Sequence, residues 1–205
     1  QISSPEKNFF LRVLLYFITP LKQLPDLKSV WYFSAKRAVK NTLKEQNFNL
    51  LFSWSSYIIS HIVSLYVKKK TNLPWIAYFS DPWTDNPYKK FNILAKKINL
   101  KLEKKVVENA DKLIFNSVGV RDLMMRKYPK KYLNKTIILP HYFDSSLYPK
   151  IKNKKNTKCI FTYTGSFYGL RTPMPLFMAI KKLKEKKSNY IKNMEFRFIG
   201  AMPIE

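Results

Sequence analysis

Short apolar runs alternate along the chain with longer segments whose apolar residues recur at helical spacing. The short runs, rich in β-branched and aromatic residues, predict strands over Asn49–Ser53, Trp75–Phe79, Lys112–Asn116 and Thr136–Leu139. Helical spacing between them predicts helices over Tyr57–Lys70, Tyr88–Ala110 and Val118–Tyr128. Strands separated by helices of crossover length pair in parallel, with both faces of the sheet covered. The pattern therefore predicts an α/β fold with a mostly parallel sheet.

The segment Pro140–Lys158 interrupts this alternation with two prolines and a polar stretch rich in Lys and Asn, which is typical of a linker. The alternation then resumes with the strand Cys159–Thr164, the helix Pro173–Lys187 and the strand Glu195–Ile199. We therefore expect a first domain over residues 1–145, a linker over 146–158 and the start of a second domain over 159–205. Upstream, only helical patterns occur, at Lys7–Ile18 and Ser29–Glu45, so the first domain is expected to lack its opening strands.

The 205 residues include 38 Lys+Arg and 13 Asp+Glu, a formal net charge of +25. Such an excess indicates nucleic acid, an anionic membrane or a phosphate-bearing substrate as partner. Part of the excess reflects a bias in the composition of the whole chain towards Lys and Asn. A single cysteine, Cys159, and two histidines exclude an internal disulfide and a Cys- or His-based metal site. We expect a reducing, cytoplasmic setting. No apolar run of about 18 residues predicts a transmembrane helix.

Two of the four glycines, Gly165 and Gly169, fall in one loop that follows a predicted strand and precedes a predicted helix. Thr172 suits the N-cap position of that helix and Pro173 its first position. Arg171 lies one residue before the cap, where the helix start favours an anion. This pattern is typical of a phosphate or diphosphate site at the carboxyl end of a strand. The alternative is an ordinary turn that needs its glycines for steric reasons.

A second candidate follows the predicted strand Trp75–Phe79, in the sequence F-S-D-P-W-T. Open α/β sheets bind ligands at the carboxyl ends of their strands. There Asp81 would orient a hydroxyl-bearing substrate and Trp83 would stack on a sugar ring. The alternative is that Asp81 caps a turn and Trp83 belongs to the core.

Other polar residues have simpler explanations. His61 lies in an apolar helical run and is expected to be buried, whereas His141 lies at the start of the linker. Glu103 and Glu108 flank two lysines on a predicted helix, so solvated pairing along the helix accounts for both.

These motifs, in this order, resemble glycosyltransferase family 4, whose members have the GT-B fold of two facing Rossmann-like domains. The resemblance rests on Leu51–Leu65, Leu73–Thr84, Glu108–Ser117, Ile137–Asp144 and Tyr163–Pro173. It implies a retaining transferase that moves a sugar from a nucleotide-sugar donor to a saccharide or lipid-linked acceptor in surface polysaccharide synthesis. It implies no metal and no cofactor beyond the nucleotide sugar.

The resemblance also implies roles for individual residues. The donor-binding residues would be Gly165, Ser166, Gly169, Arg171 and Thr172; the acceptor-side residues would be Ser53, Ser55 and Trp83; the catalytic residues would be Asp81 and Arg171. The chain departs from the family at His141 and Tyr142, where Asn-Gly is usual, and in having only Arg171 where most members have an Arg and a Lys. The family's glycine-rich loop and paired glutamates are expected outside these 205 residues, so the chain alone is expected to be inactive.

Two alternatives to a transferase follow from the same sequence. The charge of +25 favours a nucleic-acid-binding protein, although the basic residues form no recognised binding motif. The other is a non-catalytic interaction module. A transferase of this kind is expected to associate peripherally with the inner face of an anionic membrane, with Lys7–Ile18 as either an interfacial or a buried helix.

Overall fold

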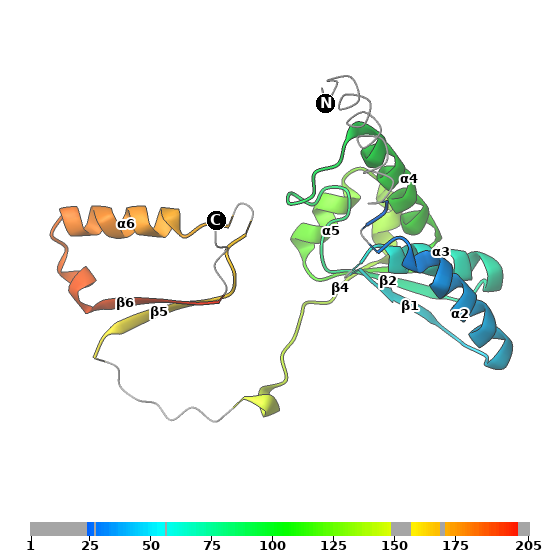
Figure 1. Cartoon of the computed structure of the whole chain (residues 1–205), viewed down its shortest axis with the longest axis horizontal. Helices are drawn as coiled ribbons and strands as arrows, with labels where there is room; N and C mark the ends of the chain where they lie inside the picture. Colours follow the sequence, from blue (N-terminus) through cyan, green and yellow to red (C-terminus); the bar gives the residue numbers. More distant parts are fainter. Residues whose placement is uncertain (1–23, 27, 56, 149–156, 169–170, 201–205) are drawn as a thin grey trace, which may run out of the picture. The chain divides into compact units, whose positions relative to one another are not determined.

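The computed structural model describes residues 24–26, 28–55, 57–148, 157–168 and 171–200 (Figure 1). The chain divides into two compact units, Gln1–Tyr142 and Phe143–Glu205, each of which is treated by itself. The helix expected over Lys7–Ile18 lies outside the described residues.

Unit 1 alternates strands and helices, labelled as in Figure 1. Its elements are α2 (Trp31–Glu45), β1 (Leu51–Trp54), α3 (Ile59–Thr71), β2 (Trp75–Phe79), α4 (Ile93–Asn109), β3 (Lys112–Phe115), α5 (Val118–Met125), a 3₁₀ helix (Lys130–Lys135) and β4 (Thr136–Ile138). The strands form one parallel sheet in the order β1-β2-β3-β4. The predicted α/β fold with a parallel sheet is therefore confirmed.

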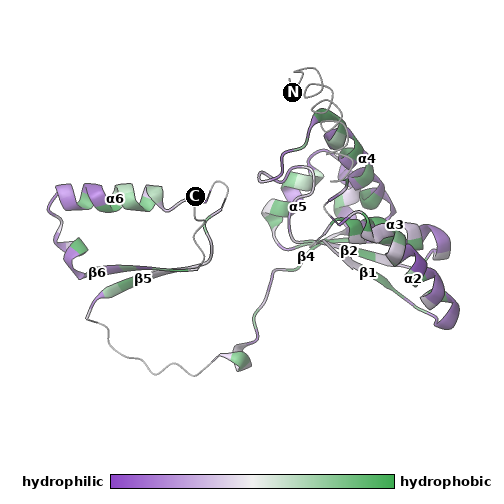
Figure 2. Cartoon of the chain, viewed as in Figure 1, coloured by the Kyte–Doolittle hydropathy of each residue, from purple (hydrophilic) through white to green (hydrophobic). Residues whose placement is uncertain are grey.

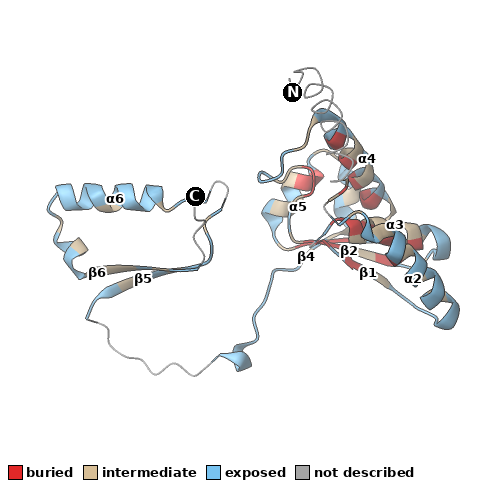
Figure 3. Ribbon diagram, in the orientation of Figure 1, coloured by how far each residue is buried: buried red, intermediate tan, exposed pale blue. Residues whose placement is uncertain are grey.

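One face of this sheet carries the core. Every second strand residue faces helices α3, α4 and α5, and buried positions lie along the strands and the helices that pack on them (Figure 3). Trp75, Phe79, Leu113 and Phe115 are fully buried there. The intervening residues include exposed apolar side chains at both sheet edges, namely Phe52, Trp54 and Ile137. At the centre of this second face, Tyr78 and Ile114 are buried. Within the described residues, the expectation that both faces are covered is therefore met fully on one face and in part on the other.

Local capping explains where the helices begin and end. The Asn92 side chain accepts a hydrogen bond from the Ala95 amide at 2.8 Å and so starts α4 five residues later than the predicted Tyr88. Ser117 caps α5 in the same way through the Val120 amide at 3.2 Å. Asn72, in the left-handed conformation with φ 54°, ends α3.

Unit 2 is a parallel strand–helix–strand arrangement, as its alternating pattern predicts. Its elements are a 3₁₀ helix (Ser145–Leu147), β5 (Cys159–Thr164), α6 (Met174–Glu185), a 3₁₀ helix (Asn189–Asn193) and β6 (Met194–Ile199). Helix α6 is hydrophobic at its start and hydrophilic at its end (Figure 2). None of the described residues of this unit is buried.

In the described part of the chain, no helix has both the length and the apolar character that a membrane span requires.

Candidate functional site

The carboxyl ends of the parallel strands bring the first group of candidate residues together. Ser55 follows β1, and Asp81 lies in the loop after β2. Asp81 is exposed, so its carboxylate is accessible to a ligand. The Trp54 indole nitrogen donates a hydrogen bond of 2.6 Å to the Ser80 hydroxyl, which ties the end of β1 to the residue before Asp81.

The position of Trp83 does not allow its side chain to stack on a sugar ring. Its side chain is fully buried, and its indole nitrogen donates to the Asn99 side-chain oxygen at 2.8 Å. A sugar ring has no access to a fully buried indole. The stacking role is therefore wrong for this structure, and Trp83 belongs to the core, as the alternative interpretation has it.

Ser53 also has a structural role. Its hydroxyl accepts a hydrogen bond of 2.9 Å from the Trp75 indole nitrogen and lies 2.7 Å from His61 Nδ1. Burial lowers the pKa of His61 to about 3, opposed by a hydrogen bond to the Tyr78 backbone, so the ring is neutral. The buried hydroxyl of Ser53 is thus held by Trp75 and His61 and does not face an acceptor.

The side-chain hydroxyl of Ser55 differs from that of Ser53. Its side-chain oxygen is buried without a hydrogen-bond partner, while its amide donates to the Tyr78 carbonyl at 3.0 Å. Buried hydroxyls of this kind are uncommon. Ser55 therefore remains a candidate, whereas Ser53 and Trp83 do not.

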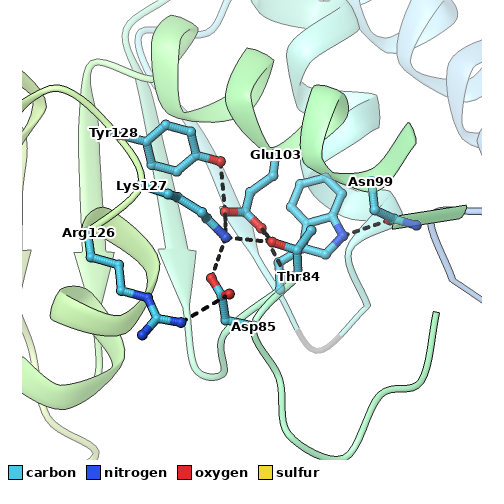
Figure 4. Close-up of polar contacts among 8 residues, drawn as sticks. Thr84, Asp85, Asn99, Glu103, Arg126, Lys127 and Tyr128 are labelled. Carbon is cyan, nitrogen blue, oxygen red and sulfur yellow. Dashed lines mark hydrogen bonds and ion pairs between the residues drawn. The ribbon is translucent and has the colours of Figure 1, made fainter. Parts of the chain in front are cut away.

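A second polar cluster, which the sequence did not predict, lies between α4, α5 and the loop after β2 (Figure 4). The Glu103 carboxylate is fully buried. Its Oε2 accepts from the Thr84 amide at 2.9 Å and the Thr84 hydroxyl at 2.7 Å. Its Oε1 accepts from Tyr128 at 2.8 Å and pairs with Lys127 Nζ, also at 2.8 Å.

This cluster corrects the interpretation of Glu103 as a solvated residue. Glu108 does form the expected exposed pair with Lys104, at 3.8 Å, but Glu103 faces the core. Burial, together with the Glu103 charge, raises the pKa of Tyr128 well above its usual value, so the phenol stays a donor. Lys127 also pairs with Asp85. The cluster therefore fixes the loop that carries Asp81 to α4 and to the segment that follows α5.

The glycine loop of unit 2 has the backbone geometry that its composition predicts. Gly165 has φ +143° and donates its amide to the Ile199 carbonyl at 2.8 Å. Gly200, with φ +152°, is so close that a Cβ there would lie 2.0 Å from the Gly165 oxygen. Both strand ends therefore require glycine, and their backbones lie side by side at the carboxyl edge of β5 and β6.

Helix α6 begins one residue later than expected. Pro173 occupies the N-cap position and Met174 is the first helical residue. The Thr172 hydroxyl still accepts a hydrogen bond from the Met174 amide, at 3.3 Å. Arg171 is exposed and its guanidinium lies 4.7 Å from the Tyr168 ring centroid.

The other two donor residues are placed differently. Ser166 is exposed and its carbonyl accepts from Tyr163 at 3.4 Å. Gly169 lies outside the described residues. The other four expected donor residues lie in the described part of the loop, Gly165 and Ser166 directly after β5, and Arg171 and Thr172 directly before α6.

The buried His61 predicts a pH dependence of stability. Since the folded pKa is about 3 and the unfolded value is about 6.5, the unfolded chain gains a proton first as pH falls. The stability that neutral His61 provides is complete above pH 6.5 and is lost as pH falls towards 3. Between pH 7 and 5 this group should lower the free energy of unfolding by about 2 kcal/mol.

Urea unfolding at both pH values measures this loss. In His61→Gln the contribution should disappear, whereas His141→Gln, at an exposed position, should leave it intact. An equal pH dependence in wild type and His61→Gln would contradict the assignment.

No protein-family model and no curated protein matches this sequence. Among the described residues, no group of three or more His, Cys, Asp or Glu side chains is arranged to hold a metal ion.

Proposed function

We propose that the chain is part of a retaining glycosyltransferase with the GT-B arrangement, which transfers a sugar from a nucleotide sugar to a saccharide or lipid-linked acceptor. Unit 2 would hold the donor, and the loop after β2 in unit 1 would face the acceptor. The proposal assigns Arg171 to the leaving diphosphate and Asp81 to the acceptor hydroxyl.

The observation that carries this proposal is the pair of glycines at the ends of β5 and β6. Gly165 and Gly200 have positive φ, and the Gly165 carbonyl oxygen occupies the place that a Cβ of Gly200 would take. The Gly165 amide donates to the Ile199 carbonyl, so these glycines contribute a strand end without Cβ atoms, which a ligand can approach closely. The start of α6 follows in the same loop, and helix starts favour the negative charge of a diphosphate.

Arg171 would supply the positive charge of this site. It is exposed at the residue before Thr172, and a guanidinium binds phosphate oxygens through two parallel hydrogen bonds. As the bond between the donor sugar and the diphosphate breaks, negative charge grows on the leaving oxygen. The guanidinium and the helix-start amides would stabilise that charge, so the proposed chemistry needs no metal ion.

Asp81 would act on the other reactant. Its exposed carboxylate lies in a loop that Glu103 anchors through Thr84. An anchored carboxylate orients a hydroxyl group by accepting its proton in a hydrogen bond, which places the hydroxyl oxygen for transfer. In this scheme the Glu103 cluster positions the loop and takes no part in the reaction.

Competition binding tests the proposal against a nucleic-acid-binding function. Fluorescently labelled UDP and GDP are titrated with the chain at moderate salt, with unlabelled single-stranded DNA as competitor. A nucleotide-sugar site predicts saturable binding of at least one nucleotide that inorganic phosphate displaces poorly. Because binding to DNA is dominated by charge, tight DNA binding with no saturable nucleotide binding would favour the alternative function.

A further inference from the structure

A pocket of about 350 Å³ opens beside the carboxyl end of β1 in unit 1. Its lining residues are Lys28, Trp31, Trp54, Tyr57, Ile59 and Ser60. Its size lies at the lower end of the range for small-molecule sites. None of the residues assigned to the donor or the acceptor so far lines it.

A single carboxylate assembles this pocket from segments far apart in the sequence. Asp26 Oδ1 accepts from the Lys28 amide at 2.8 Å, and Asp26 Oδ2 accepts from the Ile59 amide at 2.9 Å. Ile59 is the first residue of α3, which has no cap from its own Ile58 side chain. Asp26 therefore caps α3 across 33 residues and its charge suits the helix start. This contact fixes Lys28 next to the segment Tyr57–Ser60.

The aromatic side chains of the pocket are about half exposed to solvent. Trp31, Trp54 and Tyr57 are 50%, 53% and 49% exposed. The two other tryptophans of the chain, Trp75 and Trp83, are fully buried and hydrogen-bonded. Large exposed apolar groups grouped around a hollow mark interaction sites more often than scattered ones do.

The polar groups of the pocket restrict what it binds. The Ser60 hydroxyl donates to the Trp54 carbonyl at 2.6 Å, so its oxygen is left to accept a hydrogen bond from a ligand. Lys28 Nζ lies 5.8 Å from the Tyr57 ring centroid and brings a positive charge to the aromatic wall. A matching ligand has an apolar face for the rings, a hydroxyl for Ser60 and an anionic group for Lys28.

We propose that this pocket binds a pyranose ring that carries an anionic group, either a phosphate or a carboxylate. One face of a pyranose presents aliphatic C–H groups that stack on Trp or Tyr, while its hydroxyls lie at the edge. The inference rests on the proposed function in one respect: it makes the pocket the acceptor subsite. The link is the hydrogen bond of 2.6 Å from Trp54 to Ser80, next to Asp81.

The four tryptophans provide a direct test. With ¹⁵N-labelled tryptophan, the chain gives four indole N–H signals, two from the pocket and two from the core. We expect glucose 1-phosphate and glucuronic acid to shift the signals of Trp31 and Trp54 saturably and leave those of Trp75 and Trp83 in place. Glucose should bind more weakly than either, and inorganic phosphate should leave the signals of Trp31 and Trp54 unchanged.

Variants separate the contributions of the ring, the charge and the scaffold. Trp54→Ala should weaken binding of glucose 1-phosphate about tenfold, whereas Trp54→Phe, which keeps a ring, should recover part of the loss. Lys28→Gln should remove the preference for anionic over neutral sugar. Phe33→Ala is the control, because Phe33 is 74% exposed on the same helix as Trp31 but does not line the pocket.

The proposal would be overturned by shifts that phosphate alone reproduces, or by an absence of shifts with every sugar. A response to a short-chain anionic lipid without a response to sugars would instead identify a lipid pocket and equally overturn it. These outcomes are distinct from failure of the proposed function, which concerns nucleotide binding in unit 2. The pocket can bind sugar in a chain that binds no UDP or GDP.

Discussion

Replacing Lys127 with methionine is expected to lower the free energy of unfolding of the chain by about 3 kcal/mol. Lys127 Nζ lies 2.8 Å from the Glu103 carboxylate, and Glu103 is fully buried. Methionine fills a similar volume, so the main effect is to leave a buried negative charge without its cation. The donors from Thr84 and Tyr128 remain, which places the expected loss at the lower end of the range for broken buried pairs.

The matched control is Lys104→Met. Lys104 lies on α4 beside Glu103 but pairs with Glu108 at 3.8 Å in solvent, so its loss should cost less than about 1 kcal/mol. The double variant Glu103→Leu with Lys127→Met removes both charges, and it should be more stable than Lys127→Met alone. Urea unfolding followed by circular dichroism measures all three. Equal losses for Lys127→Met and Lys104→Met would show that the Glu103 cluster contributes little.

Replacing Arg171 with alanine is expected to weaken binding of UDP or GDP about 10- to 100-fold. The basis is the loss of a charge-assisted, two-point contact with the diphosphate. Arg171→Lys should recover part of the affinity, because an ammonium keeps the charge but lacks the planar pair of donors. Isothermal titration calorimetry at one fixed salt concentration measures the three affinities.

The variant Arg197→Ala distinguishes a specific contact of Arg171 with the diphosphate from a general effect of positive charge on nucleotide affinity. Arg197 is exposed on β6 in the same unit and pairs with Glu195 at 2.6 Å, so its removal changes the net charge by the same amount. We expect its effect on nucleotide affinity to be less than about twofold. Similar losses in Arg171→Ala and Arg197→Ala would mean that the nucleotide responds only to overall charge.

The sheet could be predicted from the sequence because its strands are short apolar runs with distinct boundaries. Trp75–Phe79 and Cys159–Thr164 are strands with the predicted bounds. Helix boundaries were less predictable where a cap competes with the apolar pattern. The apolar spacing extends from Tyr88, yet Asn92 is the residue that caps α4, and the sequence alone does not rank these two signals.

The Glu103 cluster was not predictable because the residues that form it lie far apart in the sequence. Glu103 is bonded to Thr84, 19 residues before it, and to Tyr128, 25 residues after it. One signal was present: Ala95, Asn99 and Glu103 recur every four residues on α4, and all three are buried. That spacing places Asn99 and Glu103 on the core face, where a polar side chain needs partners.

The candidate site was predictable in part. The positive φ of Gly165 follows from a glycine at a strand end, and the exposure of Asp81 follows from its place after β2. The exposed aromatic pocket was missed because its scaffold depends on Asp26, which contacts Ile59 across 33 residues. Trp83 was the more obvious tryptophan because it lies in the motif, yet Trp31 and Trp54 are the tryptophans that solvent reaches.

The central claim, a nucleotide-sugar site at the glycine loop of unit 2, is tested most directly with ¹⁵N-labelled glycine. The chain has four glycines, so titration with UDP-glucose or GDP-mannose follows only four amide signals. The account predicts that the signals of Gly165 and Gly200, whose backbones lie together, shift saturably while that of Gly119 on α5 stays. Saturable nucleotide binding that leaves Gly165 and Gly200 unmoved, or no binding of either nucleotide sugar, would contradict it.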